Sequence, residues 1–427
     1  DTLARALSAR GYVIVPPHAP ADVYIVNTCT VTGEADAKSR KTLRKALRAR
    51  ADAVIIVTGC YATLEPDRLA AIAGVDAVVP LDRQHTLPDL LARLRPPARP
   101  RADGLTTSIA RTRATVKVQD GCDRRCAFCA VTLARGDLRS RPLEEILAEL
   151  RGLVEAGIQE IVLTGIRLDA YGLEGDGPRL ADLVAATRAL RIPRLRLSSL
   201  EPLGIDARLA AALAAHPTLC RHFHVCLQSG DDGILRAMRR GYTADAYRAI
   251  IGLLRAAMPA ATFTTDIIVG FPGETDAAFE NTRALVEELG FLKLHIFKFS
   301  PRPHTAAAEM PDAVSDAVKA ARGAALRAVE RRLFAAIAAP FVGMEVSVLV
   351  ERAGARGEVS PPAICACARP SRRPRRAASC PRASPPPART PCWPCRWHDR
   401  RLSARIARLF HGFPAKFTSR YFVEYMK

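Results

Sequence analysis

The chain has 427 residues, of which 49% are hydrophobic, and this allows two or three globular domains, each with its own buried core. That composition excludes a largely disordered chain, and the lack of any run of 18 apolar residues excludes a membrane-spanning helix. The net charge of +20 is uneven: residues 361–427 hold 15 Lys+Arg and 2 Asp+Glu, which leaves a mildly basic body compatible with a nucleic-acid partner.

The opening DTLARALSARGY has neither the basic region nor the cleavage site of a secretory signal, so we expect a cytoplasmic protein. Its pattern is typical of an amphipathic helix over residues 2–10. Because a helix begins so early, we expect that a strand upstream of it is missing and that the N-terminus is incomplete.

Residues 1–95 alternate between helix and strand patterns. Strand-like runs at Val23–Cys29 and Ala53–Cys60 flank a charged helix at Ala35–Arg50, which predicts a βαβ unit in an open α/β domain. The Pro- and Arg-rich stretch at 93–104 then breaks the periodicity and is typical of a linker.

A second domain is predicted over residues 108–338. Six strand-like runs occur there, and a helical stretch follows each of the first five; the runs are TVKVQ, EIVLTG, RLRLSSL, HFHVCLQ, TFTTDIIVG and LKLHIFKFS. Six βα units are too few to close an eight-stranded barrel. We therefore expect a partial (β/α)6 barrel whose open side suits a macromolecular substrate.

Residues 340–427 begin like a small β-domain, with FVGMEVSVLV at 341–350, and then lose all periodicity. The following mixture of Arg, Pro, Ala and Cys is what a GC-rich gene yields when it is translated out of frame, so we expect a disrupted domain. A disordered basic tail is one alternative. A small zinc site at Cys392 and Cys395 is another, although a pair of cysteines needs two further ligands.

Three cysteines follow the first barrel strand in the segment VQDGCDRRCAFCAV. Cys122, Cys126 and Cys129 form a C-x3-C-x2-C array, and three thiolates on one loop can bind three irons of a 4Fe-4S cluster, which leaves the fourth iron open. A structural zinc site normally has four ligands, and unligated cysteines are the remaining alternative. Sites in parallel α/β folds gather where this loop falls, at the carboxyl ends of strands.

At these residues the chain resembles the radical S-adenosylmethionine (SAM) enzymes, and Phe128 matches the aromatic residue that usually precedes their third cysteine. The similarity continues from 29 to 350 with successive motifs of the methylthiotransferase family. These motifs are RSRP, LTGIRLDAYG, LSSLEP, LQSGDDGILRAMRRGYT, DIIVGFPGET and HIFKFSPRP.

The resemblance implies a SAM pocket along the strand ends. Phe128 would lie near the adenine, and the other implied contacts are Thr164 and Gly165 with the methionine part, Ser199 and Glu201 with the ribose, Gly270 and Phe271 with the adenine, and Gln228 and Arg239 elsewhere in the pocket. For Gln228 and Glu201, ordinary capping of strand–helix turns is the alternative.

Cys29 and Cys60 each end a strand-like run, and in a right-handed βαβ unit both would emerge at one sheet edge. Buried free cysteines that act as small hydrophobes are the alternative. By resemblance, these two match the second and third of three cysteines that hold an auxiliary 4Fe-4S cluster. With only two thiolates we expect that cluster to be labile or absent, about four irons to bind rather than about eight, and SAM to be cleaved without methylthio transfer.

The helix between those cysteines carries a basic stripe. Lys41, Arg44, Lys45 and Arg48 recur at helical spacing on one face, which suits contact with an RNA phosphate backbone, although a charged face is often only solvated.

The resemblance implies a tRNA methylthiotransferase, and the motif LTGIRLDAYG is most similar to the branch that acts on C2 of N6-threonylcarbamoyladenosine at position 37. Branches that act on isopentenyladenosine or on a ribosomal-protein aspartate are the alternatives within the family. A non-catalytic iron–sulfur or RNA-binding remnant is the alternative outside it. The implied partners are the tRNA anticodon region and an electron donor such as flavodoxin or ferredoxin, with the chain acting as a monomer.

Overall fold

The computed structural model describes residues 2–16, 19–30, 32–97, 112–341 and 349. The chain divides into two compact units, with the boundary between Leu333 and Phe334. The first unit holds both the N-terminal α/β domain and the barrel. The expected strand at 341–350, apart from its residues 341 and 349, and the expected zinc pair Cys392 and Cys395 lie outside the described residues, as does most of the expected linker. No described helix is long and apolar enough to span a membrane.

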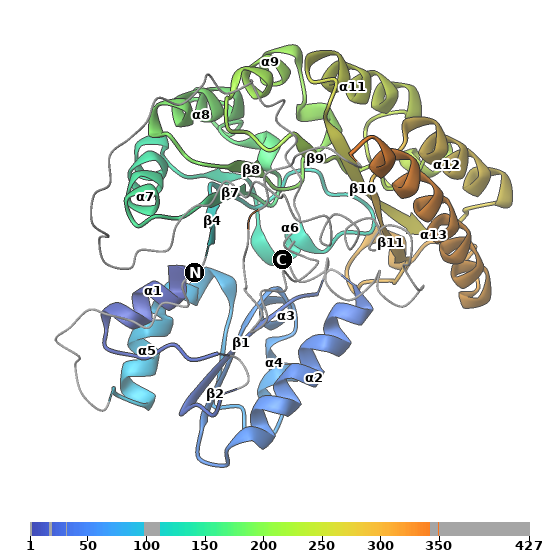
Figure 1. Cartoon of the computed structure of the whole chain (residues 1–427). Coiled ribbons are helices and arrows are strands. Elements are labelled where there is room, and N and C mark those ends of the chain that lie inside the picture. The colour runs from blue at the N-terminus through green and yellow to red at the C-terminus, as the bar shows by residue number, and fades with distance from the viewer. Residues whose placement is uncertain (1, 17–18, 31, 98–111, 342–348, 350–427) are drawn as a thin grey trace, which may run out of the picture. The chain divides into compact units, whose positions relative to one another are not determined.

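The N-terminal domain contains a parallel three-stranded sheet, which confirms the expected βαβ unit (Figure 1). Its strands are β1 (Val23–Thr28), β2 (Val54–Gly59) and β3 (Ala77–Val79). Its helices are α1 (Thr2–Ala9), α2 (Gly33–Ala49), α3 (Cys60–Leu64), α4 (Pro66–Ala70) and α5 (Leu87–Leu94). Since α5 continues to Leu94, the expected linker starts slightly later than its composition indicated.

Alternate residues of β2 serve opposite faces of this sheet, as the two-residue period of a strand requires. Ile55 and Val57 pack in one apolar cluster with Leu43 of α2, whereas Ile56 packs in another with Leu87 at the start of α5. The central strand is therefore covered on both faces, which fits its nearly continuous apolar sequence.

Helix α2 begins at a standard polar cap. The Thr32 hydroxyl accepts a hydrogen bond from the Ala35 amide at 3.1 Å. Glu34 and Asp36 lie in the first turn, where the negative charge of an acidic side chain interacts favourably with the helix dipole and stabilises the helix. The buried side of the helix includes Leu43 and Ala46, so the basic residues lie on its exposed side.

Six parallel strands form the second domain, as expected; five of the expected runs contain one strand each, and the first, TVKVQ, overlaps β4, which starts two residues earlier. They are β4 (Arg113–Lys117), β7 (Glu160–Thr164), β8 (Leu195–Leu197), β9 (His222–His224), β10 (Thr262–Val269) and β11 (Lys293–Lys298). Two three-stranded sheets, β4-β7-β8 and β9-β10-β11, are joined by single bridges such as Leu200 to Val225. The result is a partial barrel.

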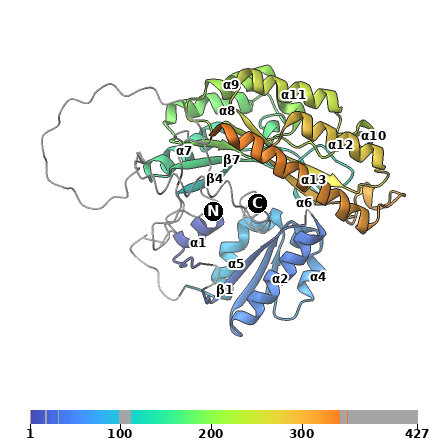
Figure 2. The same ribbon diagram turned by 45° about the vertical axis from the view of Figure 1, so that its right-hand side comes forward.

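Helices follow the barrel strands and cover their outer side (Figures 1 and 2). These helices are α7 (Leu143–Glu155), α8 (Leu180–Thr187), α9 (Ala207–Ala215), α10 (Asp232–Ala237), α11 (Ala244–Ala257) and α12 (Asp276–Leu289), with α13 (Asp316–Ala338) after the last strand. The short helix α6 (Val131–Arg135) instead follows the cysteines and contacts α3 of the N-terminal domain. One apolar cluster fills the space between strands and helices and includes Val116, Leu163 and Phe263. The carboxyl ends of the strands lie outside this packed cluster, so the residues there can carry polar side chains.

At the amino end of β7, a fully buried carboxylate joins three strands. The Glu160 carboxylate forms ion pairs with three guanidinium groups: that of Arg113 in β4 at 2.7 Å, and those of Arg194 and Arg196 in the β8 segment at 3.1 Å each. Arginine neighbours offset the cost of burying this charge, and they lower the pKa of Glu160 although burial itself raises it. These ion pairs thus join the strands at the end of the barrel opposite the loop that carries Cys122, Cys126 and Cys129.

Candidate functional site

The cysteine loop is closed at its base by a small clasp. Two short strands, β5 (Gln119–Asp120) and β6 (Arg139–Ser140), pair antiparallel, so the intervening segment leaves and re-enters at one point. Inside the clasp, the Cys122 amide donates to the Gly136 carbonyl at 3.0 Å. Gly121 has a φ of +72°, and a Cβ there would collide with the Asp137 carbonyl, so glycine is required just before the first cysteine.

The three thiols of this loop are free, partly buried and close enough to influence one another electrostatically. Burial, with a smaller contribution from the neighbouring thiols Cys126 and Cys122, raises the pKa of Cys129 to about 12. Ligation must therefore displace protons from these sulfurs, as metal binding does at thiolate sites.

The number of thiols bears on the kind of metal that the loop suits. Cys122, Cys126 and Cys129 are three free thiols on one loop. A structural zinc ion normally has four protein ligands, whereas three thiolates can bind three irons of a 4Fe-4S cluster.

A buried arginine connects the loop with the barrel interior. Arg240 donates to the Cys126 sulfur at 3.1 Å and also to the Glu201 carboxylate. Its third polar neighbour is Tyr242, whose hydroxyl donates in turn to the Leu227 carbonyl. Arg239, which the family motif indicated, is exposed instead and has a positive φ of 58°.

A second arginine holds the other side of the loop. Arg167 donates to Asp123, which follows the first cysteine, and to Asp169 at 3.2 Å. The other oxygen of Asp169 accepts from the Glu201 amide at 3.2 Å. Burial raises the pKa of Asp169 to about 6, and the Arg167 guanidinium opposes that rise. Sequence patterns missed Arg167 and Asp169, although both lie within the motif LTGIRLDAYG.

The expected methionine and ribose contacts lie together at the ends of β7 and β8. The Thr164 hydroxyl donates to the Val116 carbonyl at 3.2 Å, and the Gly165 amide donates to the Ser198 hydroxyl at 3.4 Å. Ser199 is partly buried beside this contact, and Glu201 follows it. These residues thus form one continuous edge beside the cysteine loop.

The expected adenine contacts meet in a separate apolar cluster. Phe271 is fully buried in it, together with Ala127 of the cysteine loop, and Phe128 packs against its surface. The Gly270 amide donates to Glu274 at 2.6 Å. Gln228 has a φ of +71°, and its backbone joins β10 through Asp266 and Ile268, so the structure holds it in an uncommon conformation.

Cys29 and Cys60 follow directly on a paired position of the parallel sheet. Thr28 of β1 pairs with Gly59 of β2, so both cysteines emerge at the same edge, where the Cys29 thiol helps to raise the pKa of Cys60. Gly59, like Gly121, has a positive φ, and a Cβ there would collide with the Thr28 backbone. The expected proximity of the two cysteines is confirmed.

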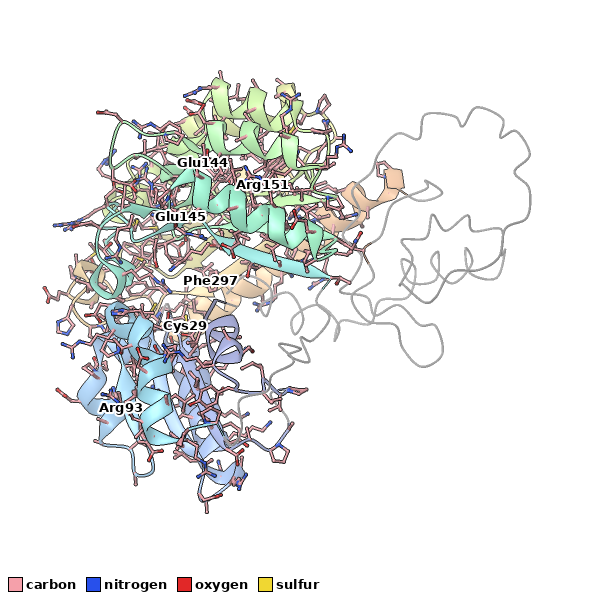
Figure 3. The ribbon with its side chains drawn as sticks, turned by 90° about the vertical axis from the view of Figure 1, so that its left-hand side faces the viewer. Cys29, Arg93, Glu144, Glu145, Arg151 and Phe297 are labelled. Carbon is pink, nitrogen blue, oxygen red and sulfur yellow. The ribbon has the colours of Figure 1, made fainter. Side chains whose placement is uncertain are left out.

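These cysteines also contact the barrel. Burial raises the pKa of Cys60, while a hydrogen bond with Arg135 lowers it, and Arg135 pairs with Asp120 of the clasp at 2.9 Å. Cys29 lies on the side of its domain nearest the barrel (Figure 3), with its backbone held by the Ser39 hydroxyl. Helix α6 starts two residues after Cys129 and ends at Arg135, so it spans the distance between the two cysteine groups.

A second contact ties the same domain to the segment after β11. Arg302 donates to the Thr30 hydroxyl at 2.6 Å and to the Asp36 carboxylate. The Gly33 amide donates to the Ser300 hydroxyl at 3.3 Å. The residue next to Cys29 is thereby fixed to the barrel.

Comparison with known families matches both parts of the chain. Residues 116–286 match the Radical SAM superfamily, and residues 1–80 match the Uncharacterized protein family UPF0004. In fold, the chain is similar to the radical S-adenosylmethionine methyltransferase TsrM of Kitasatospora setae, with a TM-score of 0.52 and 18% identity over 68% of this chain and 66% of that chain.

Several curated proteins are similar in sequence. Threonylcarbamoyladenosine tRNA methylthiotransferase MtaB of Bacillus subtilis is 37% identical over 78% of this chain and 77% of its own length. The protein of the same name from Thermotoga maritima is 37% identical over 82% and 83%. A tRNA-2-methylthio-N(6)-dimethylallyladenosine synthase of Cereibacter sphaeroides is 39% identical over 83% and 84%.

Proposed function

Because this chain belongs to the radical SAM methylthiotransferases, we propose that it methylthiolates C2 of N6-threonylcarbamoyladenosine at position 37 of tRNA. The observation that carries the proposal is the meeting of two cysteine groups, on the loop after β4 and at the edge of the N-terminal sheet, through the single helix α6. Two similar proteins named for this nucleoside support the choice of substrate.

Cys122, Cys126 and Cys129 would hold the 4Fe-4S cluster, since three free thiols lie on one loop whose ends are paired by β5 and β6. Bound with SAM, that cluster supplies a deoxyadenosyl radical. Arg240 donates a hydrogen bond to the Cys126 sulfur at 3.1 Å and so holds that sulfur in place. Arg167 fixes the opposite side of the loop through Asp123.

The pocket residues of this chain would then orient SAM. Thr164, Gly165, Ser199 and Glu201 would face its methionine and ribose parts. Phe128, Gly270 and Phe271 would approach the adenine, with Gln228 and Arg239 completing the pocket. The support is their placement: the first four form one edge beside the loop, and the aromatic pair packs in one cluster with the loop's own Ala127.

Cys29 and Cys60 would provide ligands for an auxiliary 4Fe-4S cluster that carries the sulfur to be transferred. Their shared sheet edge and their link to Arg135 support this role. The tRNA anticodon region would enter from the open side of the barrel, and a flavodoxin or ferredoxin would supply electrons to a cytoplasmic, monomeric enzyme.

The test is anaerobic reconstitution with iron and sulfide, followed by reaction with SAM, dithionite and tRNA that carries threonylcarbamoyladenosine. We expect deoxyadenosine from the three-cysteine loop, and a 2-methylthio nucleoside in the tRNA digest where a third ligand completes the auxiliary site beside Cys29 and Cys60. Methylthiolation of dimethylallyladenosine instead would move the chain to the other branch, for which the Cereibacter sphaeroides relative is named. Absence of deoxyadenosine from a chain with a full loop cluster would favour a binding role and contradict the proposal.

A further inference from the structure

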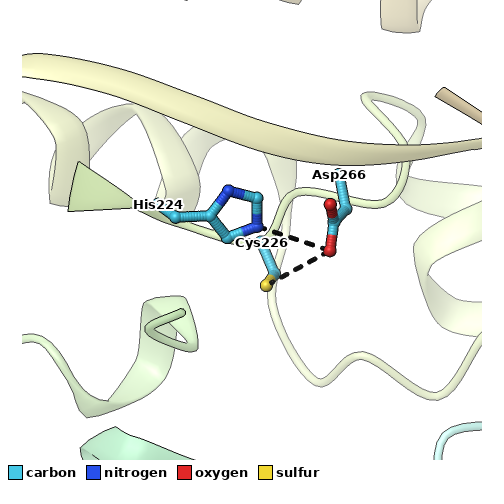
Figure 4. A group of neighbouring side chains, drawn as sticks. All are labelled: His224, Cys226 and Asp266. Atoms are coloured by element: carbon cyan, nitrogen blue, oxygen red, sulfur yellow. Dashed lines mark hydrogen bonds and ion pairs between the residues drawn. The ribbon is translucent and has the colours of Figure 1, made fainter. Parts of the chain in front are cut away.

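A second group of metal-ligand side chains lies outside the cysteine loop. His224 ends β9, Cys226 follows two residues later, and Asp266 lies in the neighbouring strand β10. Figure 4 shows the imidazole, the thiol and the carboxylate converging on one point between the strands.

The distances within this group suit one small ion. His224 Nε2 lies 3.4 Å from Asp266 Oδ2, Cys226 Sγ lies 3.9 Å from the same oxygen, and all three ligand atoms are within 4.8 Å of one another. A tetrahedral zinc ion with bonds of 2.0 to 2.3 Å spaces its ligand atoms by about 3.3 to 3.8 Å. The side chains would therefore need only small adjustments to bind such an ion.

The imidazole is oriented as a ligand. The His224 side chain is 4% exposed, and its Nε2 is a buried atom without a hydrogen-bond partner. Its other nitrogen, Nδ1, lies 3.0 Å from the Thr264 hydroxyl. When Nδ1 carries the proton and donates it to Thr264, the lone pair of Nε2 points into the group, which is the usual support for a metal-bound histidine.

The charges also call for a cation. Asp266 brings a carboxylate beside a thiol and an imidazole, and each of these three groups can donate an electron pair to a cation. Its side-chain contacts among the described residues include the weak thiol donor of Cys226 and the off-axis imidazole of His224. A buried carboxylate normally has stronger partners than these, and a divalent ion would satisfy it together with the Cys226 thiolate.

We infer that His224, Cys226 and Asp266 form a three-ligand site for a divalent zinc-class ion. One nitrogen, one sulfur and one oxygen ligand favour zinc over the oxygen-seeking ions magnesium and calcium. The fourth position is open on the side of Asp266, which is the most exposed of the three with 24% of its side chain accessible. Three protein ligands and one open position are the arrangement of a zinc ion that binds an exchangeable molecule.

The test measures metal content and is independent of the tRNA reaction. The full chain is reconstituted anaerobically with iron and sulfide, equilibrated with zinc chloride, desalted and assayed for zinc and iron by mass spectrometry. We expect Cys226→Ser and Asp266→Asn each to bind about one zinc fewer per chain than the unaltered protein, with iron unchanged. Cobalt(II) offered instead should give a thiolate charge-transfer band that Cys226→Ser removes.

The matched control is Cys220→Ser, another buried cysteine of the same region, which lies 4.0 Å from Glu160 and outside the group. It should retain the zinc and the cobalt band. Equal zinc content in all four proteins would overturn the inference. Thermal unfolding followed by circular dichroism shows whether each variant folds. If Cys226→Ser does not fold, Asp266→Asn still decides the test, because it nearly preserves the shape of the side chain.

Discussion

Cys126 is the loop cysteine whose sulfur accepts a hydrogen bond from a guanidinium, and replacing it tests the radical chemistry directly. We expect Cys126→Ala to abolish deoxyadenosine formation, because the loop would lose one of three iron ligands. Stability should change by only about 1 kcal/mol, since the residue is partly exposed on a loop outside the core. Deoxyadenosine is measured by chromatography and stability by thermal unfolding.

Cys220→Ala is the matched control for that variant because it removes a thiol far from the loop. It should keep deoxyadenosine formation at the level of the unaltered chain. Continued SAM cleavage in Cys126→Ala would contradict the assignment of the loop as the radical SAM site.

Arg240 and Glu201 form a buried ion pair, and breaking one side of it should cost more than breaking both. Arg240→Gln leaves the Glu201 carboxylate without its guanidinium, so we expect a loss of about 3 kcal/mol in the free energy of unfolding. The double variant Arg240→Gln, Glu201→Gln should regain much of that stability but not SAM cleavage. Urea titration gives the energies, and a double variant with full activity would show that the pair is only structural.

The pair also shows where reading of the sequence falls short. The family motif LRAMRRGYT presents two adjacent arginines, and the motif indicated Arg239. In the structure Arg239 is exposed, while Arg240 is buried and donates to the Cys126 sulfur. Because α10 ends at Ala237, the helical period no longer fixes which side chain points inward. Adjacent residues of a turn cannot be told apart without its backbone angles.

Helix α2 carries the basic stripe Lys41, Arg44, Lys45 and Arg48, all exposed and without an ion pair among the residues that the structure describes. We expect Lys41→Ala combined with Lys45→Ala to weaken tRNA binding, because two charges that neutralise RNA phosphates are removed. The slope of log affinity against log salt should fall by about two units, one for each lysine replaced. Filter binding at several salt concentrations measures both quantities.

Arg93 of α5 supplies the control, since it is an exposed arginine on another helix of the same domain (Figure 3). Arg93→Ala removes one charge outside the stripe and should leave the salt slope unchanged. If both variants reduce the slope by the same amount for each charge removed, tRNA responds only to the total charge of the protein. In that case α2 is not a docking surface for tRNA.

The longer elements could be predicted, whereas the shortest could not. Strand β2 opens with the apolar run VIIV and β10 is eight residues long and rich in β-branched residues, so their sequence alone located them. The clasp strands β5 and β6 have two residues each and no detectable period, although they position the cysteine loop. Such pairs are set by contacts between distant residues rather than by local pattern.

The attachment of the N-terminal domain to the barrel depends on Arg302. We expect Arg302→Met to leave Asp36 as an unpaired buried charge, to lower the free energy of unfolding by roughly 3 kcal/mol and to release the segment next to Cys29. Deoxyadenosine formation should persist, while methylthiolated nucleoside per deoxyadenosine should fall by roughly 10 to 100-fold, because a shift of about 1 Å in a reacting group has that effect.

Arg283→Ala is the control for this variant, since its exposed pairs with Glu280 and Glu287 should contribute at most about 1 kcal/mol. An unchanged product ratio in Arg302→Met, at normal iron content, would show that the domain contact does not position the transfer step. No local sequence pattern could have indicated this contact, since Arg302 and Asp36 are 266 positions apart.

Arg135 ends a helix of only five residues that starts just after Cys129, and it bonds both Asp120 in the barrel and Cys60 in the other domain. A displacement of Cys129 is thus transmitted through little more than one helical turn to the second group of thiols. Coupling of this kind is reciprocal, so metal uptake at one group changes affinity at the other by the same factor. We therefore expect the two cysteine groups to acquire their cofactors cooperatively during biogenesis of the enzyme, rather than in two unrelated loading events.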